Sequence, residues 1–588
     1  MTFFKRVLAT IVGLIIFSIL GVVLMISIAV VSNRSLKPTI DVKEASILNL
    51  KLDFDIEDHI GKIEYKDFPF LNEYPQNSLF GIINAIKKAK IDPKIKGISL
   101  ENNTISAGIA QIGALRKALI DFKQSGKFIV SYADLYSQKS YYLSSVADTI
   151  YTNPIGVVDF KGLSSEQYFY KDFQEKTGIK MEVVRHGKYK SAAEPFLSNQ
   201  MSPENKEQIN SYLTSIWNTL KNDISKSRNI SETKLNTIAD SLYGRNPNLA
   251  LENKLIDKIA YYDEFTNALK NQLNIDIEND LEKIDILDYM NTITNLIEIE
   301  DENKPKVAVI YAEGEIIYGK GNENFVGQGI INESLKTARE DEAIKAIVLR
   351  INSPGGSALA SELIWREIEI TKKIKPVVVS MGNTAASGGY YMASNADYIF
   401  AEPTTITGSI GVFTVLPNFK DFLQNMGIST YQVTTNTNAI NYSFAKPLTS
   451  TQKKYMKQSI IDTYNLFLER VAEGRKMTNE EVNNIAQGRV WTGSQALEVG
   501  LVDELGGLDV AIEKACALSE NTYLKTVEFP VFKKDFDYSL SQFGLIKSKE
   551  DLIKEELGLE AHKIWQSLKA KSRHQGIQLL FPYNSEID

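Results

Sequence analysis

Two halves of the chain repeat one another. The segment IKGISLENN from Ile95 matches IKAIVLRIN from Ile344, an offset of 249 residues. A longer block ending at Asp148, and the segment TGIKMEVV from Thr177, each have a counterpart 249 residues later. Three ungapped blocks at one offset indicate a tandem duplication, so we expect both halves to adopt the same fold.

Each half has the sequence pattern of an α/β unit. Short runs rich in β-branched residues alternate with longer stretches of helical period; the clearest are strands at 307–310, 346–349 and 377–380 and helices at 358–371 and 451–470. Such alternation predicts parallel strands joined by helical crossovers. With 588 residues, the chain is also too long for one core. We predict an N-terminal repeat domain at 45–297, a C-terminal repeat domain at 305–525, and an extension at 526–588 that has no counterpart in the repeat.

An apolar run near the N-terminus predicts a membrane anchor. Residues 7–31 contain no charged side chain, and an apolar helix needs roughly 20 residues to cross a bilayer. The apolar part of a cleaved signal peptide is shorter, at about 7 to 15 residues, so an uncleaved anchor is favoured. Lys5 and Arg6 place the N-terminus in the cytoplasm, although Arg34 and Lys37 weaken this orientation. We therefore expect the rest of the chain outside the inner membrane.

Composition argues against several other classes of protein. The formal net charge is −7 and the basic residues are scattered, so we expect no nucleic-acid partner. Cys516 is the single cysteine, which excludes an internal disulfide. The histidines have no metal-binding spacing, so no metal site is expected; they are His59, His186, His562 and His574.

A serine between a predicted strand and a predicted helix is the candidate nucleophile. In MGNTAASGGYYMAS, Ser387 falls at the expected start of the helix. A serine there can present its hydroxyl at the sheet edge, and the N–H of Gly388 points to the same place. The paired glycines of NSPGGS, Gly355 and Gly356, can present further N–H groups, although Pro-Gly-Gly is more often only a tight turn. The alternative for Ser387 is a helix cap without chemistry.

The proton acceptor for this serine is not a histidine of the same half. No histidine lies between His186 and His562, so a Ser-His-Asp triad within the C-terminal half is excluded. A serine hydroxyl needs a base to become a nucleophile. A lysine can serve if burial lowers its pKa, because desolvation disfavours the charged ammonium.

An ordered set of motifs connects the chain to a known family. NSPGGS, AASGGYY and TGSIGV occur in the C-terminal half, and RHGKYKSAAEPF and MSPE occur in the N-terminal half. Together they resemble the long, duplicated form of signal peptide peptidase A, also called protease IV, from the anchor to about residue 525. The resemblance implies two tandem domains with the fold of the Clp protease proteolytic subunit and the crotonases, and a serine protease that needs no cofactor.

The resemblance also implies roles for individual residues. Ser387 would be the nucleophile, Lys190 the general base and Ser409 the residue that orients the lysine nitrogen. The oxyanion hole would come from the backbone of Gly388, Gly355 and Gly356. The implied substrates are signal peptides that have been released and left in the membrane, and the implied assembly is a homotetramer whose sites face inward.

The duplication favours one composite site. At the offset of 249, Ser387 lies opposite Gln138, so the N-terminal half lacks a nucleophile. Lys190 lies opposite Ala439, and no lysine occurs between residues 420 and 446. Each half therefore has what the other lacks, as expected for a site assembled between them.

Four residues near these motifs need separate interpretation. We expect Lys188 to point to the opposite face of an extended strand from Lys190 and to be a surface charge, whereas His186 would share the face of Lys190 and is the best substitute base. Glu194 is either a salt-bridge partner or a surface carboxylate. Arg489, in GRVWTG, is interpreted as structural, binding carbonyls or a carboxylate.

Two other functions stay open from the sequence. A crotonase-like enzyme acting on acyl-CoA could use the same glycine turn, but it would need neither the anchor nor the serine and lysine pair. A membrane scaffold with an inactive site is the second alternative, since one half has already lost its nucleophile.

Overall fold

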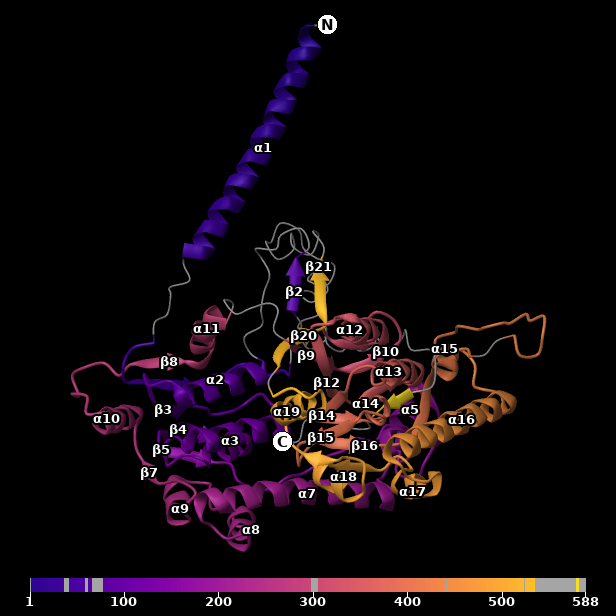
Figure 1. Cartoon of the computed structure of the whole chain (residues 1–588). Helices are drawn as coiled ribbons and strands as arrows, with labels where there is room; N and C mark the ends of the chain where they lie inside the picture. The colour runs from indigo at the N-terminus through magenta and orange to yellow at the C-terminus, as the bar shows by residue number, and fades with distance from the viewer. Residues whose placement is uncertain are drawn as a thin grey trace.

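The computed structural model describes residues 2–35, 42–58, 62–65, 78–297, 305–439, 442–522, 524–534 and 578–580. Each half is built on its own mainly parallel sheet, and the two halves lie side by side (Figure 1). A third sheet, also of six strands, contains strands from both halves. This third sheet positions the candidate site.

The sheet of the N-terminal half is parallel throughout. Its order is β7-β5-β4-β3-β1-β8. The strands are β1 (Ser46–Leu50), β3 (Ile95–Leu100), β4 (Phe128–Tyr136), β5 (Thr149–Val158), β7 (Lys258–Ile259) and β8 (Lys283–Asp285).

The sheet of the C-terminal half has the order β18-β16-β14-β12-β9-β20, with β15 beside β14 and β19 beside β15. Its strands are β9 (Lys306–Glu313), β12 (Ile344–Ser353), β14 (Val377–Ala386), β15 (Tyr398–Ala401), β16 (Ile406–Gly408), β18 (Val490–Thr492), β19 (Glu504–Leu505) and β20 (Lys525–Phe529). The three strands predicted in this half lie within β9, β12 and β14. Since β3 and β12, and likewise β4 and β14, begin 249 residues apart, the duplication predicted from the sequence is confirmed in the fold.

Paired helices of the two halves cover these sheets. The pairs are α2 (Leu79–Ile91) with α12 (Gln328–Glu340), α3 (Ile109–Lys123) with α13 (Ala358–Thr371), and α7 (Pro203–Arg228) with α16 (Ser450–Arg475). The helices predicted at 358–371 and 451–470 are α13 and part of α16. Helix α7 begins where the Ser202 side chain accepts a hydrogen bond from the Asn205 N–H, a normal N-cap.

Helix α7 also joins the halves. It runs along the base of the molecule (Figure 1). Gln208 of α7 accepts a hydrogen bond from the Val490 N–H at 2.9 Å, and the Gln495 amide donates to Ser211 at 3.0 Å. Val490 lies in β18, so a helix of the first repeat is fixed to a strand of the second.

The third sheet has the order β11-β10-β13-β22-β17-β6. Its strands are β6 (Lys180–His186), β10 (Glu315–Ile317), β11 (Phe325–Gly327), β13 (Gly355–Ser357), β17 (Val412–Asn418) and β22 (Gln578–Leu580). Strand β6, from the N-terminal half, pairs antiparallel with β17, from the C-terminal half, over seven residues. The duplicated halves are thus joined by main-chain hydrogen bonds next to the predicted site residues.

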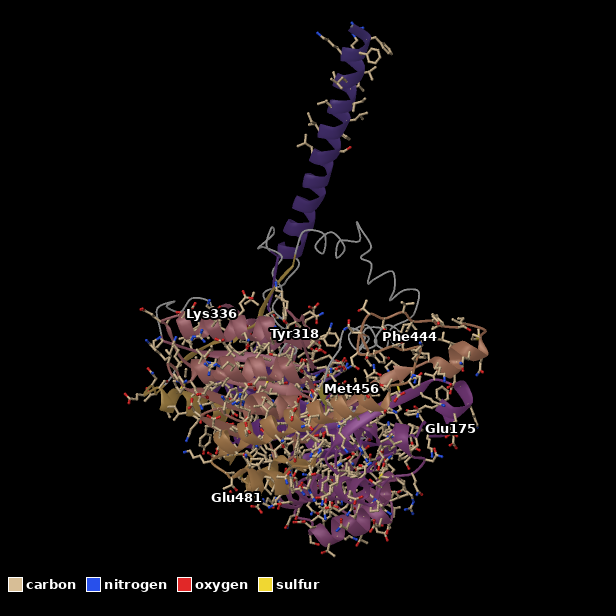
Figure 2. The ribbon with its side chains drawn as sticks, turned by 90° about the vertical axis from the view of Figure 1, so that its right-hand side faces the viewer. Glu175, Tyr318, Lys336, Phe444, Met456 and Glu481 are labelled. Atoms are coloured by element: carbon tan, nitrogen blue, oxygen red, sulfur yellow. The ribbon has the colours of Figure 1, made fainter. Side chains whose placement is uncertain are left out.

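The apolar N-terminal segment forms helix α1 (Thr2–Ser35), which projects from the rest of the molecule (Figures 1 and 2). The predicted anchor, residues 7–31, is described only in part, since within it the side chains of residues 15, 19 and 22–31 are not described. Within the described part of the chain, no helix is long and apolar enough to span a membrane.

Candidate active site

The turn from β14 to helix α14 (Gly388–Ala393) holds Ser387 in a constrained conformation. Its φ of 56° and ψ of −113° lie in a region that residues with a Cβ seldom adopt. The Ser387 N–H donates to the Gly408 carbonyl at 2.8 Å, which holds the turn from the neighbouring strand β16. The Ser387 side chain makes no capping hydrogen bond, so the interpretation as a helix cap is wrong and the hydroxyl is available for another partner.

Lys190 reaches this hydroxyl from the other half of the chain. It follows β6, and its Nζ lies 2.8 Å from the Ser387 Oγ. The same Nζ lies 2.9 Å from the Ser409 Oγ and 3.0 Å from the Ser409 carbonyl oxygen. All three residues are completely buried. The structure therefore brings together the predicted serine, lysine and second serine.

The contacts of the lysine nitrogen match those of a neutral amine. A neutral amine has two N–H donors and one lone pair, whereas the ammonium has three donors and no acceptor. The Ser409 carbonyl and hydroxyl can accept the two N–H bonds, which leaves the lone pair for the Ser387 hydroxyl. Burial lowers the pKa of Lys190 well below its usual value, because the charged form loses its hydration. Among the described residues, no carboxylate forms an ion pair with it.

Small residues make room for the lysine. Gly488 has a φ of 83°, and a methyl group on it would lie 2.6 Å from the main-chain nitrogen of Lys190. A methyl group on Gly411 would lie 3.2 Å from the Lys190 Cδ. The ring of Phe413, a residue of β17, lies 5.8 Å from the Lys190 Nζ. Sequence reasoning did not identify these glycines, because only the close approach of Lys190 distinguishes them from ordinary turn glycines.

Ser409 is fixed by its main chain. It has a φ of 51°, and its N–H donates to the Arg489 carbonyl at 2.7 Å. This turn, after β16, directs both the hydroxyl and the carbonyl oxygen of one residue at the lysine nitrogen. The side chain therefore has little freedom to move away from the amine.

The predicted oxyanion glycines lie together, but not as a turn. Gly355 and Gly356 belong to the short strand β13, with φ angles of 102° and 155°. A methyl group on Gly388 would lie 3.2 Å from the Gly356 nitrogen and 2.6 Å from the Ser361 Oγ, so Gly388 is in direct contact with β13. The Gly355 N–H already donates to the Ser353 Oγ at 3.2 Å. The N–H groups of Gly388 and Gly356 are thus the better pair of donors.

The strand argument around Lys190 was wrong, but its conclusion for Lys188 is confirmed. Residues 187–190 form a turn that begins at Gly187, with a φ of 100°, and do not continue the strand, so the argument from alternating faces does not apply to Lys188 and His186. Lys188 is nevertheless exposed, as expected of a surface charge. The His186 ring packs on the Tyr464 ring, with centroids 4.5 Å apart. Burial lowers the pKa of His186, but it is not bonded to Ser387, whose partner is the lysine.

Glu194 and Arg489 have structural contacts. Glu194 is buried and accepts hydrogen bonds from the Ser202 N–H and from the Asn205 amide, so it is not a surface carboxylate. Its two bonds are to neutral donors, and no described residue forms a salt bridge with it. Arg489 donates to Glu207 at 2.7 Å and lies over the Tyr189 ring. The structural interpretation of Arg489 is therefore confirmed.

Comparison with known proteins places this arrangement in a family. The model of peptidase family S49 matches residues 121–276 and 369–521, once in each repeat, and the Clp protease model matches residues 300–405. The chain belongs to peptidase family S49. Its α/β fold is accordingly of the Clp protease type, and its activity is that of a serine protease.

Several relatives in the S49 family cover most of the chain. Protease 4 of Haemophilus influenzae is 39% identical over 448 residues, 74% of this chain and 72% of that protein. Protease 4 of Salmonella typhi is 38% identical over 76% of this chain and 72% of that protein. The chloroplastic serine protease SPPA of Arabidopsis thaliana is 33% identical over 80% of this chain and 69% of that protein. Membership of a peptidase family decides against the alternative of an acyl-CoA enzyme.

Proposed function

We propose that Ser387 is the nucleophile and Lys190 the general base of this S49 peptidase. The observation that carries the proposal is the distance of 2.8 Å between the Lys190 Nζ and the Ser387 Oγ, where both side chains are completely buried. The neutral amine takes the hydroxyl proton while the serine oxygen attacks the peptide carbonyl carbon. The resulting ammonium then gives its proton to the leaving amine. Water, deprotonated by the same lysine, hydrolyses the acyl-enzyme.

Ser409 and the glycines complete this mechanism. Ser409 orients the amine by accepting both of its N–H bonds, so the lone pair faces Ser387. The oxyanion of the tetrahedral intermediate binds to the backbone N–H groups of Gly388 and Gly356, whereas the N–H of Gly355, the third predicted donor, is already bonded to Ser353. Backbone donors that are already in place need no rearrangement when the charge develops.

The substrates we propose are released signal peptides and similar apolar peptides. Two relatives are named Protease 4, and another relative, from Enterococcus faecium, is named putative signal peptide peptidase SppA. Helix α1 would anchor the enzyme in the inner membrane, with the catalytic part on the periplasmic side. The uncharged run 7–31 and the basic residues Lys5 and Arg6 support this orientation. An anchor would hold the site where apolar peptides accumulate.

The duplication supports an assembly of several copies, which we take to be a homotetramer. The pair β6·β17 links the first half to the second within one chain. The counterpart of β17 is 163–169 and that of β6 is 429–435, at the offset of 249. In the described structure neither segment forms a strand. Segment 429–435 of one copy would pair as a strand with segment 163–169 of the next copy. Head-to-tail contacts of this kind can close into a ring.

Labelling with a fluorophosphonate tests the proposed function. The reagent reacts with an activated serine hydroxyl, so we expect the intact chain to be labelled and the Ser387→Ala variant to remain unlabelled. Lys190→Met should also abolish labelling, because it removes the proton acceptor while it keeps the buried volume. Lys188→Met, two residues away, is the matched control and should label like the parent chain. Labelling that persists in Lys190→Met would contradict the lysine base, and an unlabelled parent chain would favour an inactive scaffold.

A further inference from the structure

The turn that carries Lys190 is bonded on one side to a single buried amide. Gln208, in α7, is completely buried. Its side-chain nitrogen donates to the Tyr189 carbonyl at 3.3 Å and to the Ser191 Oγ at 3.2 Å. These two partners directly precede and follow Lys190 in the chain. A side-chain amide has two N–H donors, one for each acceptor, so Gln208 contacts the chain on both sides of the lysine.

The oxygen of the same amide binds the second repeat. It accepts from the Val490 N–H at 2.9 Å, at the start of β18. The carbonyl of the same peptide group, that of Arg489, accepts from the Ser409 N–H at 2.7 Å. In a trans peptide the N–H and the C=O point in opposite directions, so Gln208 and Ser409 lie on opposite sides of one peptide group. A single peptide group therefore separates Gln208 from the residue that orients the lysine.

The orientation of the Gln208 amide is fixed by its partners. A reversed amide would place its NH₂ against the Val490 N–H and its oxygen against the Tyr189 carbonyl oxygen. Buried donors and acceptors would then lose their hydrogen bonds, which costs free energy. The amide is thus held in one orientation and acts as a spacer of fixed length between its partners in the two repeats.

The distance between Lys190 and Ser409 depends on contacts across the seam, which is the boundary between the two repeats. The strand pair β6·β17 holds the chain that precedes Lys190. Farther along α7, the Gln495 amide donates to the Ser211 hydroxyl at 3.0 Å, but neither residue adjoins Lys190 or Ser409. Gln208 differs, because it bonds the neighbours of the lysine on one side and the peptide group that binds Ser409 on the other.

We propose that Gln208 is a positioning residue of the active site, which holds the turn of Lys190 and the turn of Ser409 at a fixed distance across the seam. The inference rests on the proposed function, because it takes Lys190 as the general base. Gln208 acts through the residues on either side of the lysine and takes no part in bond making.

Loss of this amide should loosen the lysine turn without releasing it. The Tyr189 N–H would still donate to the Gln487 carbonyl at 2.9 Å. A misplacement of about 1 Å near a reacting group can cost about 100-fold in rate, so a smaller shift of Lys190 should cost about tenfold. An amine that moves away from Ser409 also gains hydration, and the pKa of Lys190 should then rise toward its ordinary value.

The test removes the amide and keeps its volume. End-point fluorophosphonate labelling first counts the active sites in each full-length preparation. For Gln208→Met we expect kcat for a fluorogenic apolar peptide to fall about tenfold and KM to stay within about twofold. The midpoint of the pH profile of kcat/KM should move upward by about half a pH unit or more. Ser211→Ala removes the next contact of α7 across the seam and is the matched control, with the kcat, KM and pH midpoint of the parent chain.

A double-variant cycle with Ser409→Ala shows whether the two residues act on the same amine. If Gln208 positions Lys190 against Ser409, the combined variant should lose less than the product of the two single losses in kcat. A loss equal to that product would overturn the positioning role. Gln208→Asn keeps an amide that is one methylene too short to reach both repeats, so it should behave like Gln208→Met. It replaces that variant in the cycle if the methionine chain does not fold.

The outcomes separate this inference from the proposed function. A parent-like kcat and pH midpoint in both Gln208 variants would overturn the positioning role and leave the protease intact. A lower kcat with the pH midpoint of the parent chain would also overturn it, because a residue that only supports the fold does not change the titration of the lysine. If the parent chain is not labelled, or if Lys190→Met is labelled like the parent, the proposed function fails, and the inference fails with it.

Discussion

In the proposed mechanism, the chemistry of this peptidase depends on the lysine amine. Burial lowers the pKa of Lys190, so the amine is already neutral at a pH at which an exposed lysine is charged. Only the neutral form can accept the Ser387 proton. We predict that kcat/KM for a fluorogenic peptide rises with pH through this lowered pKa and reaches its plateau below about pH 10, the range in which an ordinary lysine titrates. A rate that is constant from about pH 6 to pH 10 would argue against a lysine base.

The same shift has a cost in stability. The unfolded chain binds a proton at Lys190 that the folded chain does not, so the free energy of unfolding increases with pH between the lowered pKa and the ordinary value near about 10.4. Lys190→Met keeps the apolar volume and has no proton to lose. We predict that it raises the thermal midpoint at pH 7 and that its advantage shrinks as the pH approaches about 10. Thermal unfolding at several pH values measures this, and a midpoint below that of the parent at pH 7 would contradict it.

Ser409 should matter less than the dyad, because it orients the base without taking part in bond making. Ser409→Ala removes the hydroxyl that lies 2.9 Å from the Lys190 nitrogen but keeps the carbonyl oxygen at 3.0 Å. We predict a fall in kcat of about tenfold, or about 1.4 kcal/mol. Ser409→Gly lacks the same hydroxyl but tolerates the φ of 51°. Equal losses of kcat in both variants would support orientation by the hydroxyl, whereas a kcat like that of the parent in the glycine variant would show that the hydroxyl is not needed.

At the level of elements, a buried ion pair ties the N-terminal half to the strand that leads to the glycines. Arg350 of β12 donates to the Asp58 carboxylate through Nε at 2.9 Å and Nη2 at 3.1 Å. Its Nη1 donates to the Ser380 hydroxyl and the Met381 carbonyl of β14. Both charged residues are almost completely buried, so each depends on the other for compensation.

We predict that Asp58→Leu alone lowers stability by about 3–5 kcal/mol, because it leaves the arginine buried without its counter-charge. Arg350→Met in the same chain removes that charge, and the double variant should recover most of the loss. Thermal unfolding of the two single variants and the double variant forms the cycle. Fluorophosphonate labelling of each protein then shows whether the site depends on the pair itself or only on the packing of the two halves. Additive losses in the double variant would contradict the interaction.

The sequence was informative wherever a periodic pattern had a counterpart in the other repeat. Helix α13 begins and ends at the predicted residues because an amphipathic stretch is bounded by Ser357 and a strand. The turn at 187–190 was not predicted, because alternation along β6 gives no sign that the strand ends at His186. The contact between Lys190 and Gly488 also could not be predicted, since it depends on segments about 300 residues apart. Strand β22 lies in an extension without a repeat, so no comparison pointed to it.

The whole molecule is a pair of repeats in which one of two equivalent contacts is made within the chain. Within the chain, β6 of the first repeat pairs with β17 of the second. Of the equivalent segments, 429–435 is exposed throughout, whereas 163–169 alternates between exposed and half-buried residues. Tyr431 and Val433 are 95% and 91% accessible. Figure 2 shows Glu175, close in sequence to the first segment, and Phe444, which follows the second, on the same side of the molecule. Large apolar side chains at this level of exposure are typical of a surface that is covered in an assembly.

Blocking the strand should therefore dissociate the proposed assembly without disabling the site. Tyr431→Pro with Val433→Pro removes N–H donors that a neighbouring copy would use, whereas Tyr431→Thr with Val433→Thr keeps the strand-forming tendency and reduces apolarity. We predict that the proline variant sediments as a monomer in detergent and that the threonine variant sediments with the parent. Labelling of Ser387 should persist in both, because Lys190 comes from the same chain. A proline variant that sediments with the parent would mean that copies associate through another surface, and loss of labelling would mean that a neighbouring copy completes the site.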